Sequence, residues 1–229
     1  MKYIGANGAA KKWGITDRRV TLLCNQGRVE GAYRMGGTWA IPENAPKPVD
    51  PRRDKNKQNR LETAKNESIK TKRLLLIPVN MTHVQDIFDN FTTEITTYMY
   101  PKPAENIDET KSVVETFIKQ RENKTDFVYA ITKDDKFIGL AGIHKLNDPV
   151  PELGVWTKKN AHGNKFGREA VTAIVKFMRK IKFDSFIYPV DKRNVASCKI
   201  AESLGGVIKG KRTGKGMAGN ELQIVEYWI

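Results

Sequence analysis

The sequence is poor in cysteine, with only Cys24 and Cys198 among its 229 residues. The two lie far apart, without a CxxC pair or histidines at zinc-ligand spacing, so the sequence indicates neither a zinc site nor a disulfide framework. Apolar runs are short, and none approaches the roughly 18 residues that a membrane-spanning helix needs. Residues 1–7 lack the continuous apolar segment of a signal peptide. We therefore expect a cytoplasmic protein with reduced thiols, no metal and no membrane contact.

Acidic residues are scarce relative to basic ones: 26 Asp and Glu stand against 40 Lys and Arg, a net charge of +14. Residues 1–60 hold 13 of the Lys and Arg and 5 of the Asp and Glu, so this part alone carries +8. Clustered positive charge favours a polyanionic partner, of which nucleic acid is the commonest. A basic surface without a partner is the alternative.

Apolar side chains are nearly absent from residues 46–60, where Val49 is the only apolar residue besides three prolines. A segment of this composition cannot bury a core. Residues 61–70 allow a helix but show no clear apolar stripe. We expect a basic linker over residues 52–70, between a small domain over residues 1–51 and a larger domain over residues 71–229.

The first 51 residues contain the pattern of two short helices. Residues 6–13 allow two helical turns that end at Gly14. Thr16 is a good N-cap for a second helix over residues 18–26, which Gly27 ends. Two short helices joined by such a turn form a helix-turn-helix.

A β-hairpin is predicted next, because residues 29–34 and 38–41 flank a Gly36–Gly37 turn. The whole segment resembles the winged helix-turn-helix modules of phage excisionases and MerR-like proteins. The residues that carry the resemblance are Ala9, Trp13, Gly14, Ile15, Thr16, Val20, Cys24, Gly27, Arg28, Val29, Gly31, Ala32, Gly37, Trp39, Ile41 and Pro42.

The resemblance implies that the second helix enters the major groove of DNA. The candidate DNA contacts are Arg18, Arg19, Thr21 and Asn25 on that helix and Arg34 on the hairpin. Modules of this kind also dock other proteins or join two copies of a chain, so a protein partner or a homodimer is the alternative.

The larger domain is predicted to be a mixed α/β sheet. Apolar spacing over residues 71–229 gives the order β-α-α-β-β-β-α-β-α-β-β. Its most informative stretch is an expected strand over residues 152–157, a polar loop containing Gly163 and Gly167, and an amphipathic helix. Such a junction leaves backbone N–H groups unpaired at the positive end of a helix dipole, which favours a phosphate. The loop is neither a P-loop nor a dinucleotide fingerprint, because GK(S/T) and GxGxxG are both absent.

The loop at residues 162–167 resembles the acetyl-CoA pyrophosphate loop of the GNAT superfamily of N-acetyltransferases, Arg/Gln-x-x-Gly-x-Gly/Ala. His162 replaces the Arg or Gln, and Lys165 stands where the middle glycine is usual. Two further stretches resemble the ribosomal-protein N-terminal acetyltransferase branch: Arg73-Leu-Leu-Leu, and Asn194 with Ser197 before Glu202-Ser-Leu-Gly205.

The resemblance implies the GNAT fold, a mixed sheet with flanking helices, and acetyl-CoA as co-substrate. It assigns the cofactor to Val155, Trp156, Thr157, His162, Gly163, Asn164, Lys165, Phe166, Gly167, Arg168, Asn194 and Ser197. His162 could also be taken for a base, but the alignment puts it beside the pyrophosphate.

The resemblance also suggests catalytic groups. Glu152 is placed as the general base, directly or through water, although an ordinary strand-end carboxylate is the alternative. Many relatives protonate the leaving thiolate with a tyrosine, where this chain has Ala201, so Ser197 is the expected substitute. Tyr98 and Tyr100 either line a pocket for the acceptor amine or pack against the fold.

These patterns together predict an N-acetyltransferase that acts on a primary amine and carries a nucleic-acid-binding module. The acceptor stays open between a peptide or protein α-amine, a protein lysine and a small-molecule amine. The alternative is a DNA-binding transcriptional regulator whose GNAT domain senses CoA with little or no turnover.

Overall fold

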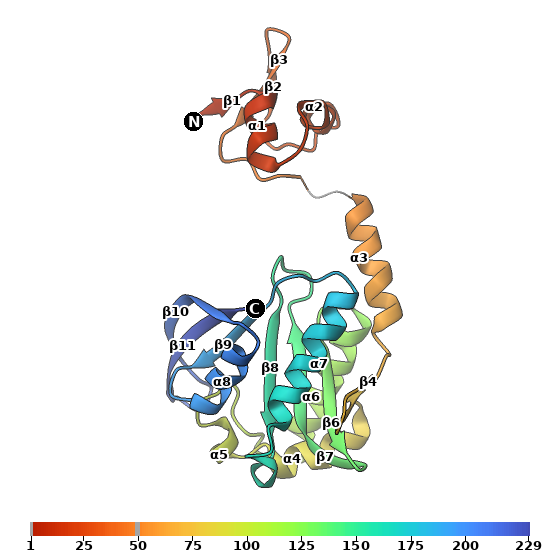
Figure 1. Cartoon of the computed structure of the whole chain (residues 1–229), viewed down its shortest axis with the longest axis vertical. Coiled ribbons are helices and arrows are strands. Elements are labelled where there is room, and N and C mark those ends of the chain that lie inside the picture. The colour runs from red at the N-terminus through yellow and green to blue at the C-terminus, as the bar shows by residue number, and fades with distance from the viewer. Residues whose placement is uncertain (1, 49–50) are drawn as a thin grey trace. The chain divides into compact units, whose positions relative to one another are not determined.

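A computed structural model describes residues 2–48 and 51–229 of the chain (Figure 1). Its contacts divide the chain into two compact units, Met1–Asn56 and Lys57–Ile229. The division falls inside the expected linker, whereas residues 49 and 50, close to the expected end of the first domain, lie outside the described residues.

The smaller unit contains the two helices that the sequence pattern predicted. Helix α1 spans Ala6–Trp13 and ends at Gly14, which takes the left-handed conformation with φ 63°. Helix α2 spans Asp17–Asn25, and the hydroxyl of its N-cap Thr16 accepts a hydrogen bond from the Arg19 amide at 3.3 Å. Glycine ends α1 because a residue without Cβ adopts positive φ at little cost.

A three-stranded sheet completes the unit, in the order β1 (Tyr3–Ile4), β3 (Thr38–Pro42), β2 (Tyr33–Met35). The hairpin turns at Gly36 and Gly37, as predicted. Its first strand is shorter than expected, because residues 29–31 form a turn and Val29 packs in the core instead. The sequence did not indicate β1, since two residues are too short to show alternation.

The core of the smaller unit lies where α1, α2 and β3 meet. Each contributes a fully buried apolar residue: Ala9, Val20 and Ile41. The indole of Trp13 donates to the Ala45 carbonyl at 3.3 Å and so ties α1 to the chain that follows β3. The apolar positions that suggested two helices are therefore the positions that build this core.

The expected linker over residues 52–70 is instead structured. It contains helix α3 (Pro51–Ala64) and strand β4 (Ile69–Lys70). Leu61 and Ala64 are fully buried in the core of the larger unit, and Arg60 Nε donates to the Ile181 carbonyl at 2.9 Å. Residues three apart lie on the same face of a helix, so these two apolar side chains enter the core together. The other residues of the segment are mostly polar, and its composition therefore did not indicate a buried face.

The larger unit is built on an eight-stranded sheet in the order β10-β11-β9-β8-β7-β6-β5-β4. Neighbouring strands are antiparallel except for β8 and β9, which are parallel. The strands after β4 are β5 (Leu75–Pro78), β6 (Phe127–Lys133), β7 (Lys136–His144), β8 (Glu152–Thr157), β9 (Ile187–Asp191), β10 (Val207–Lys215) and β11 (Glu221–Trp228).

Helices cover both faces of this sheet. Apolar residues of α7 (Phe166–Lys180) and α8 (Val195–Ser203) share one core with the sheet, and those of α4 (Val84–Asn90) and α6 (Ile107–Glu122) share another. In Figure 1, α7 crosses the near face. Short turns complete the set: η1 (Met81–His83), α5 (Thr93–Thr96) and η2 (Lys159–Ala161). The predicted order of strands and helices is confirmed, with α5 and the two single turns added.

The parallel neighbours β8 and β9 pair at one position, Glu152 opposite Ile187. The amide of Ile187 donates to the Pro151 carbonyl at 2.9 Å, and beyond this point the two strands separate. The sheet therefore opens between them along the rest of β8.

We expect Leu61→Ala to lower the free energy of unfolding by about 2–5 kcal/mol, because the side chain is fully buried on α3. Urea denaturation of the intact chain measures the change. Asn59→Ala on the same helix is the matched control, because Asn59 is exposed. Equal effects of the two substitutions would show that α3 is not anchored in the larger unit.

Candidate functional site

A cleft of about 1130 Å³ lies where β8 and β9 separate. Its walls come from β8, β9, the first turns of α7 and α8, the segment around α5, and strands β10 and β11. The site therefore uses parts of the chain from Glu94 to Ile224, brought together by the opening in the sheet.

The edge of β8 presents backbone groups to this cleft. The Lys158 amide donates to the Ile138 carbonyl of β7 at 2.8 Å, and peptide groups alternate along a strand. The peptide groups of Val155 and Thr157 therefore face the gap, and that of Trp156 faces β7. Of the three residues predicted to offer amides, two are placed to do so. The Trp156 ring packs against Phe91 with ring centroids 4.9 Å apart, and the residue is among those that line the cleft.

The N-terminus of α7 opens into the same cleft. Its N-cap residue, Lys165, has φ 63° and makes no side-chain capping bond. The amides of Phe166, Gly167 and Arg168 occupy the first turn, where a helix has no internal acceptors for its N–H groups. They lie at the positive end of the helix dipole, so this end of the cleft suits an anion.

The side chains of the preceding loop have more varied roles than predicted. His162 and Gly163 line the cleft, and His162 Nε2 donates to the Thr157 carbonyl at 2.8 Å. Asn164 is not among the cleft-lining residues, and its amide donates to the Ala161 and His162 carbonyls at 3.2 and 3.1 Å. The Phe166 ring is buried in the core, so only its backbone is available to a ligand.

Hydrogen bonds from Thr71 and Arg73 connect the segment before β5 to this loop and to the first turn of α7. Arg73 Nε donates to Glu169 in the first turn of α7 at 2.7 Å, and a terminal nitrogen donates to the Asn164 carbonyl at 3.1 Å. Thr71 donates to the same carboxylate at 2.6 Å. Burial would raise the pKa of Glu169, but the hydrogen bonds from Thr71 and Arg73 hold that pKa below its usual value. The carboxylate stays ionised and ties the loop to the start of β5.

The N-terminus of α8 forms the opposite wall. Asn194 caps the helix by accepting from the Ser197 amide at 3.1 Å, and both residues line the cleft. The Ser197 hydroxyl is 2.8 Å from the hydroxyl of Tyr188, which is 2% exposed. Burial raises the pKa of Tyr188 to about 12, so this phenol keeps its proton. It can therefore donate to Ser197.

Two ionisable residues face each other on the sheet at the closed end of the gap. Glu152 and His144 are partners in the β7–β8 register, and both line the cleft. Lys145 Nζ donates to Glu152 Oε1 at 2.6 Å. His144 Nδ1 is 2.9 Å from Asp126 Oδ1. The sequence pattern did not indicate His144 and Asp126 as partners, because they lie 18 residues apart and meet only through the β6–β7 hairpin.

The predicted acceptor residues lie across the cleft. Tyr98 and Tyr100 both line it, and the Arg193 guanidinium lies 5.3 Å from the Tyr98 ring. The Met217 amide donates to the Tyr100 carbonyl at 2.7 Å. Asn220 donates to the Thr97 carbonyl at 3.1 Å. The α5 segment and the β10–β11 turn therefore form one wall.

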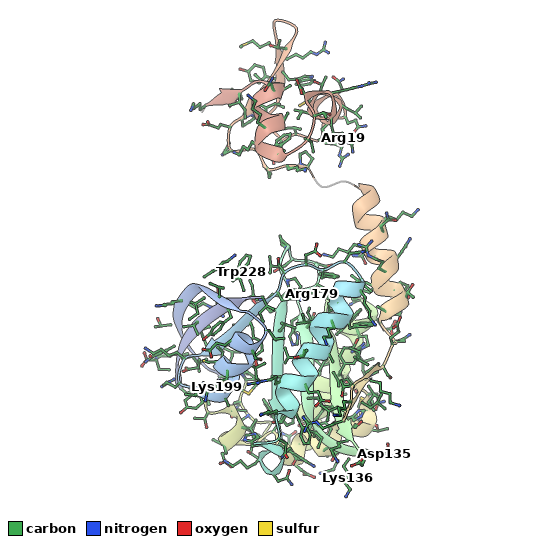
Figure 2. All side chains as sticks on the ribbon, in the orientation of Figure 1. Arg19, Asp135, Lys136, Arg179, Lys199 and Trp228 are labelled. Atoms are coloured by element: carbon green, nitrogen blue, oxygen red, sulfur yellow. The ribbon has the colours of Figure 1, made fainter. Side chains whose placement is uncertain are left out.

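The residues predicted to contact DNA are far from this cleft in the chain and share the smaller unit. Arg18 and Asn25 on α2 are exposed, and Arg19 and Thr21 are half-buried; Figure 2 labels Arg19. Arg34 is exposed on β2 with its guanidinium 5.8 Å from the Trp39 ring. Four of the five thus lie on one helix.

Among residues 2–48 and 51–229, no three His, Cys, Asp or Glu side chains are placed to hold a metal ion together. In the same residues, no helix has both the length and the apolar character needed to cross a membrane.

The family model described as "Acetyltransferase (GNAT) domain" matches residues 73–207. No curated protein matches the sequence.

Several solved structures have a similar fold. The Microcin C7 self-immunity acetyltransferase MccE, solved with acetyl-CoA and AMP, is similar at a TM-score of 0.64 and 15% identity over 69% of this chain and 93% of its own. Spermidine N-acetyltransferase from Vibrio cholerae, solved with CoA and spermine, is similar at a TM-score of 0.60 and 18% identity over 69% of this chain and 96% of its own. An acetyl transferase of Salmonella typhimurium that modifies the N-terminal serine of ribosomal protein L7/L12 is similar at a TM-score of 0.61 and 16% identity, over 71% of this chain and 98% of its own. At these identities the likeness shows the shared fold.

We expect Lys165→Gly to raise the free energy of unfolding by up to about 1 kcal/mol. The reason is that Lys165 has a left-handed backbone conformation, which strains a lysine but not a glycine. Lys165→Ala is the matched control, since alanine removes the long side chain but keeps the strain. Urea denaturation compares the two variants. A Lys165→Ala variant more stable than Lys165→Gly would contradict this account of the N-cap.

Proposed function

The chain belongs to the GNAT acetyltransferase family, and from this premise we propose that it transfers the acetyl group of acetyl-CoA to a primary amine. The observation that carries the proposal is the uncapped first turn of α7 beside the gap-facing edge of β8, in one cleft. The first suits the pyrophosphate of CoA, and the second suits an acyl group and its extended pantetheine arm.

The residues of the cleft divide between the parts of this cofactor. The amides of Gly167 and Arg168 receive the pyrophosphate, with the cations of Lys165 and Arg168 beside them. Asn194 and Ser197 lie where the pantetheine arm reaches the end of β9. His162 stays a candidate contact of the cofactor, because it lines the cleft, and its Nε2 donates to the Thr157 carbonyl.

Acetyl-CoA supplies an activated acyl group as a thioester. We assign one of the gap-facing amides, that of Val155 or that of Thr157, to the thioester oxygen, on which negative charge grows as the amine attacks, and the other to the pantetheine arm. Glu152, which the sequence suggested as the base, is assigned to bind the acceptor's ammonium group through its carboxylate, beside the Lys145 ammonium group that donates to one of its oxygens. The Ser197 hydroxyl donates a hydrogen bond to the departing thiolate, and Tyr188 donates to Ser197 in turn.

The acceptor amine enters on the side of the sheet that carries Glu152, between β8 and the wall of Tyr98 and Tyr100. Solved neighbours act on a protein N-terminus and on a polyamine, and both are primary amines that a carboxylate can hold. A peptide α-amine and a small-molecule amine are accordingly the two acceptors to try.

We expect acetyl-CoA to bind the intact chain and Arg168→Gln to weaken binding about tenfold, because a charge-assisted contact to phosphate is lost. Isothermal titration measures both dissociation constants. Arg179→Gln is the matched control: Arg179 is exposed near the other end of α7 and is labelled in Figure 2. No binding by the parent chain would exclude this cofactor.

We also propose that the smaller unit is a winged helix-turn-helix that binds nucleic acid. The support is the helix–turn–helix–hairpin order of α1, α2, β2 and β3 and the exposed cations Arg18 and Arg34. A DNA-binding regulator that senses CoA is the second candidate function, because Lys165 and Ala201 both depart from the family's pattern. Acetyl transfer without DNA binding would leave the module as a docking or dimer element.

The intact chain should shift a mixed-sequence DNA duplex on a gel, with affinity that falls as salt rises. Arg18→Gln should weaken binding about tenfold, because the residue lies on the helix proposed to enter the groove. Lys136→Gln is the control, an exposed cation of the larger unit labelled in Figure 2. Equal weakening by both variants would indicate a general charge effect and contradict the proposed interface.

A further inference from the structure

We propose that His144, oriented by Asp126, is the base that removes the proton from the acceptor amine, and that Glu152 holds the ammonium form beside it. The inference rests on the proposed acetyl transfer. It adds two residues of the larger unit that neither the sequence pattern nor the family resemblance pointed to.

The first support is the contact between the two side chains. Asp126 is 8% exposed, and its Oδ1 lies 2.9 Å from His144 Nδ1. Burial alone would raise the pKa of Asp126, but hydrogen bonds from His144 and Thr125 hold that pKa below its usual value. Asp126 is therefore a carboxylate that only accepts, so His144 Nδ1 carries the hydrogen. In the neutral ring, Nε2 is then the bare nitrogen.

The second support is where that nitrogen lies. Gly142 and Gly154 are partners in the β7–β8 register, next to the pair His144 and Glu152. A Cβ added at Gly142 would lie 3.0 Å from His144 Nε2, and one added at Gly154 would lie 3.5 Å from it. The ring therefore lies over two residues without side chains, and His144 itself lines the cleft with its side chain 34% exposed. The two glycines thus leave room for Nε2 over the sheet, on a side chain that lines the cleft.

The third support is that Glu152 suits the binding of an ammonium ion, whereas His144 suits the removal of its proton. The Lys145 ammonium group donates to one oxygen of Glu152 at 2.6 Å. The charged groups near His144 are Asp126, which contacts its Nδ1, Glu152, its partner in the strand register, and Lys145. A carboxylate attracts an ammonium ion but is a poor match for removing its proton at neutral pH. Imidazole is the side chain that most readily takes a proton there, and a carboxylate behind Nδ1 stabilises the imidazolium that forms.

The ammonium group gives one proton to Nε2, and the freed electron pair on nitrogen forms the N–C bond to the acetyl carbon while the C=O electron pair moves onto the oxygen. That pair then re-forms the C=O bond as the C–S bond breaks, and the electron pair of the C–S bond leaves with the sulfur. The nitrogen gives its second proton to the departing thiolate, directly or through water, which leaves the neutral amide and the CoA thiol. The imidazolium returns the first proton to solvent.

The test compares His144→Gln, Asp126→Asn and Glu152→Gln in the intact chain with acetyl-CoA. The acceptor probes are a peptide with a free N-terminal serine and spermine, and the acceptor-free hydrolysis of acetyl-CoA is followed alongside. His144→Gln should lower kcat about 100-fold or more, with the acetyl-CoA Kd changed by less than about twofold, since base catalysis affects the chemical step. Asp126 acts through His144, so Asp126→Asn should lower kcat about tenfold with the same unchanged Kd.

Glu152→Gln should instead raise the acceptor KM more than it lowers kcat, because the ammonium group loses its partner. Asp135→Asn is the control for the aspartate change, because Asp135 is exposed in the turn at the opposite end of β7 from His144 (Figure 2). The acetyl-CoA Kd shows in every case that the variant is folded.

A ¹⁵N NMR measurement of the parent chain adds a readout that needs no acceptor: the neutral ring of His144 should carry its hydrogen on Nδ1. A hydrogen on Nε2, or a kcat of His144→Gln within about threefold of the parent, would overturn the proposal. If the parent neither binds nor consumes acetyl-CoA, the proposed function itself fails. An active parent with a fully active His144→Gln variant would overturn the role of His144 alone.

Discussion

The separation of β8 from β9 is the constraint on which the larger unit depends. A sheet normally pairs the N–H and C=O groups along both edges of an inner strand. Here the two strands share one position, Glu152 with Ile187, and beyond it the peptide groups on that side of β8 face the gap instead of β9. The helices that follow each strand, α7 and α8, bring their N-termini to the same opening. One break in pairing thus creates both the cleft and the means of binding in it.

The strand, loop and helix that form this side of the cleft could be largely predicted from the sequence because their signals are local. The strand over residues 152–157, the loop and the helix follow one another directly, and the structure gives the strand those same bounds. Asn164 and Phe166 show the limit of such reading. Both lie in the motif, but one side chain closes the loop and the other enters the core. A motif indicates which backbone meets a ligand, whereas the direction of each side chain depends on the packing around it.

The remaining features escaped because they depend on contacts distant in sequence. His144 and Asp126 meet only when β6 and β7 pair in their native register. Helix α3 was predicted to be a linker because its composition is polar, although Leu61 and Ala64 are buried against the sheet's core. In the smaller unit, Thr16 and Gly14 fixed the helix ends correctly since capping acts within a few residues. Strand β1 was missed because its partner, β3, lies more than thirty residues away.

The two sides of the cleft are built from separate parts of the chain. The end of the cleft that we assign to phosphate uses β8, α7 and α8. The opposite wall joins the α5 segment to the β10–β11 turn through backbone acceptors at Thr97 and Tyr100. Bonds to backbone carbonyls do not depend on the identity of the side chains there. Substitutions of the side chains at Tyr100 or Met217 can therefore accumulate without breaking these bonds. Such a chain can change the amine it accepts over evolutionary time while its means of holding the acyl donor stays constant.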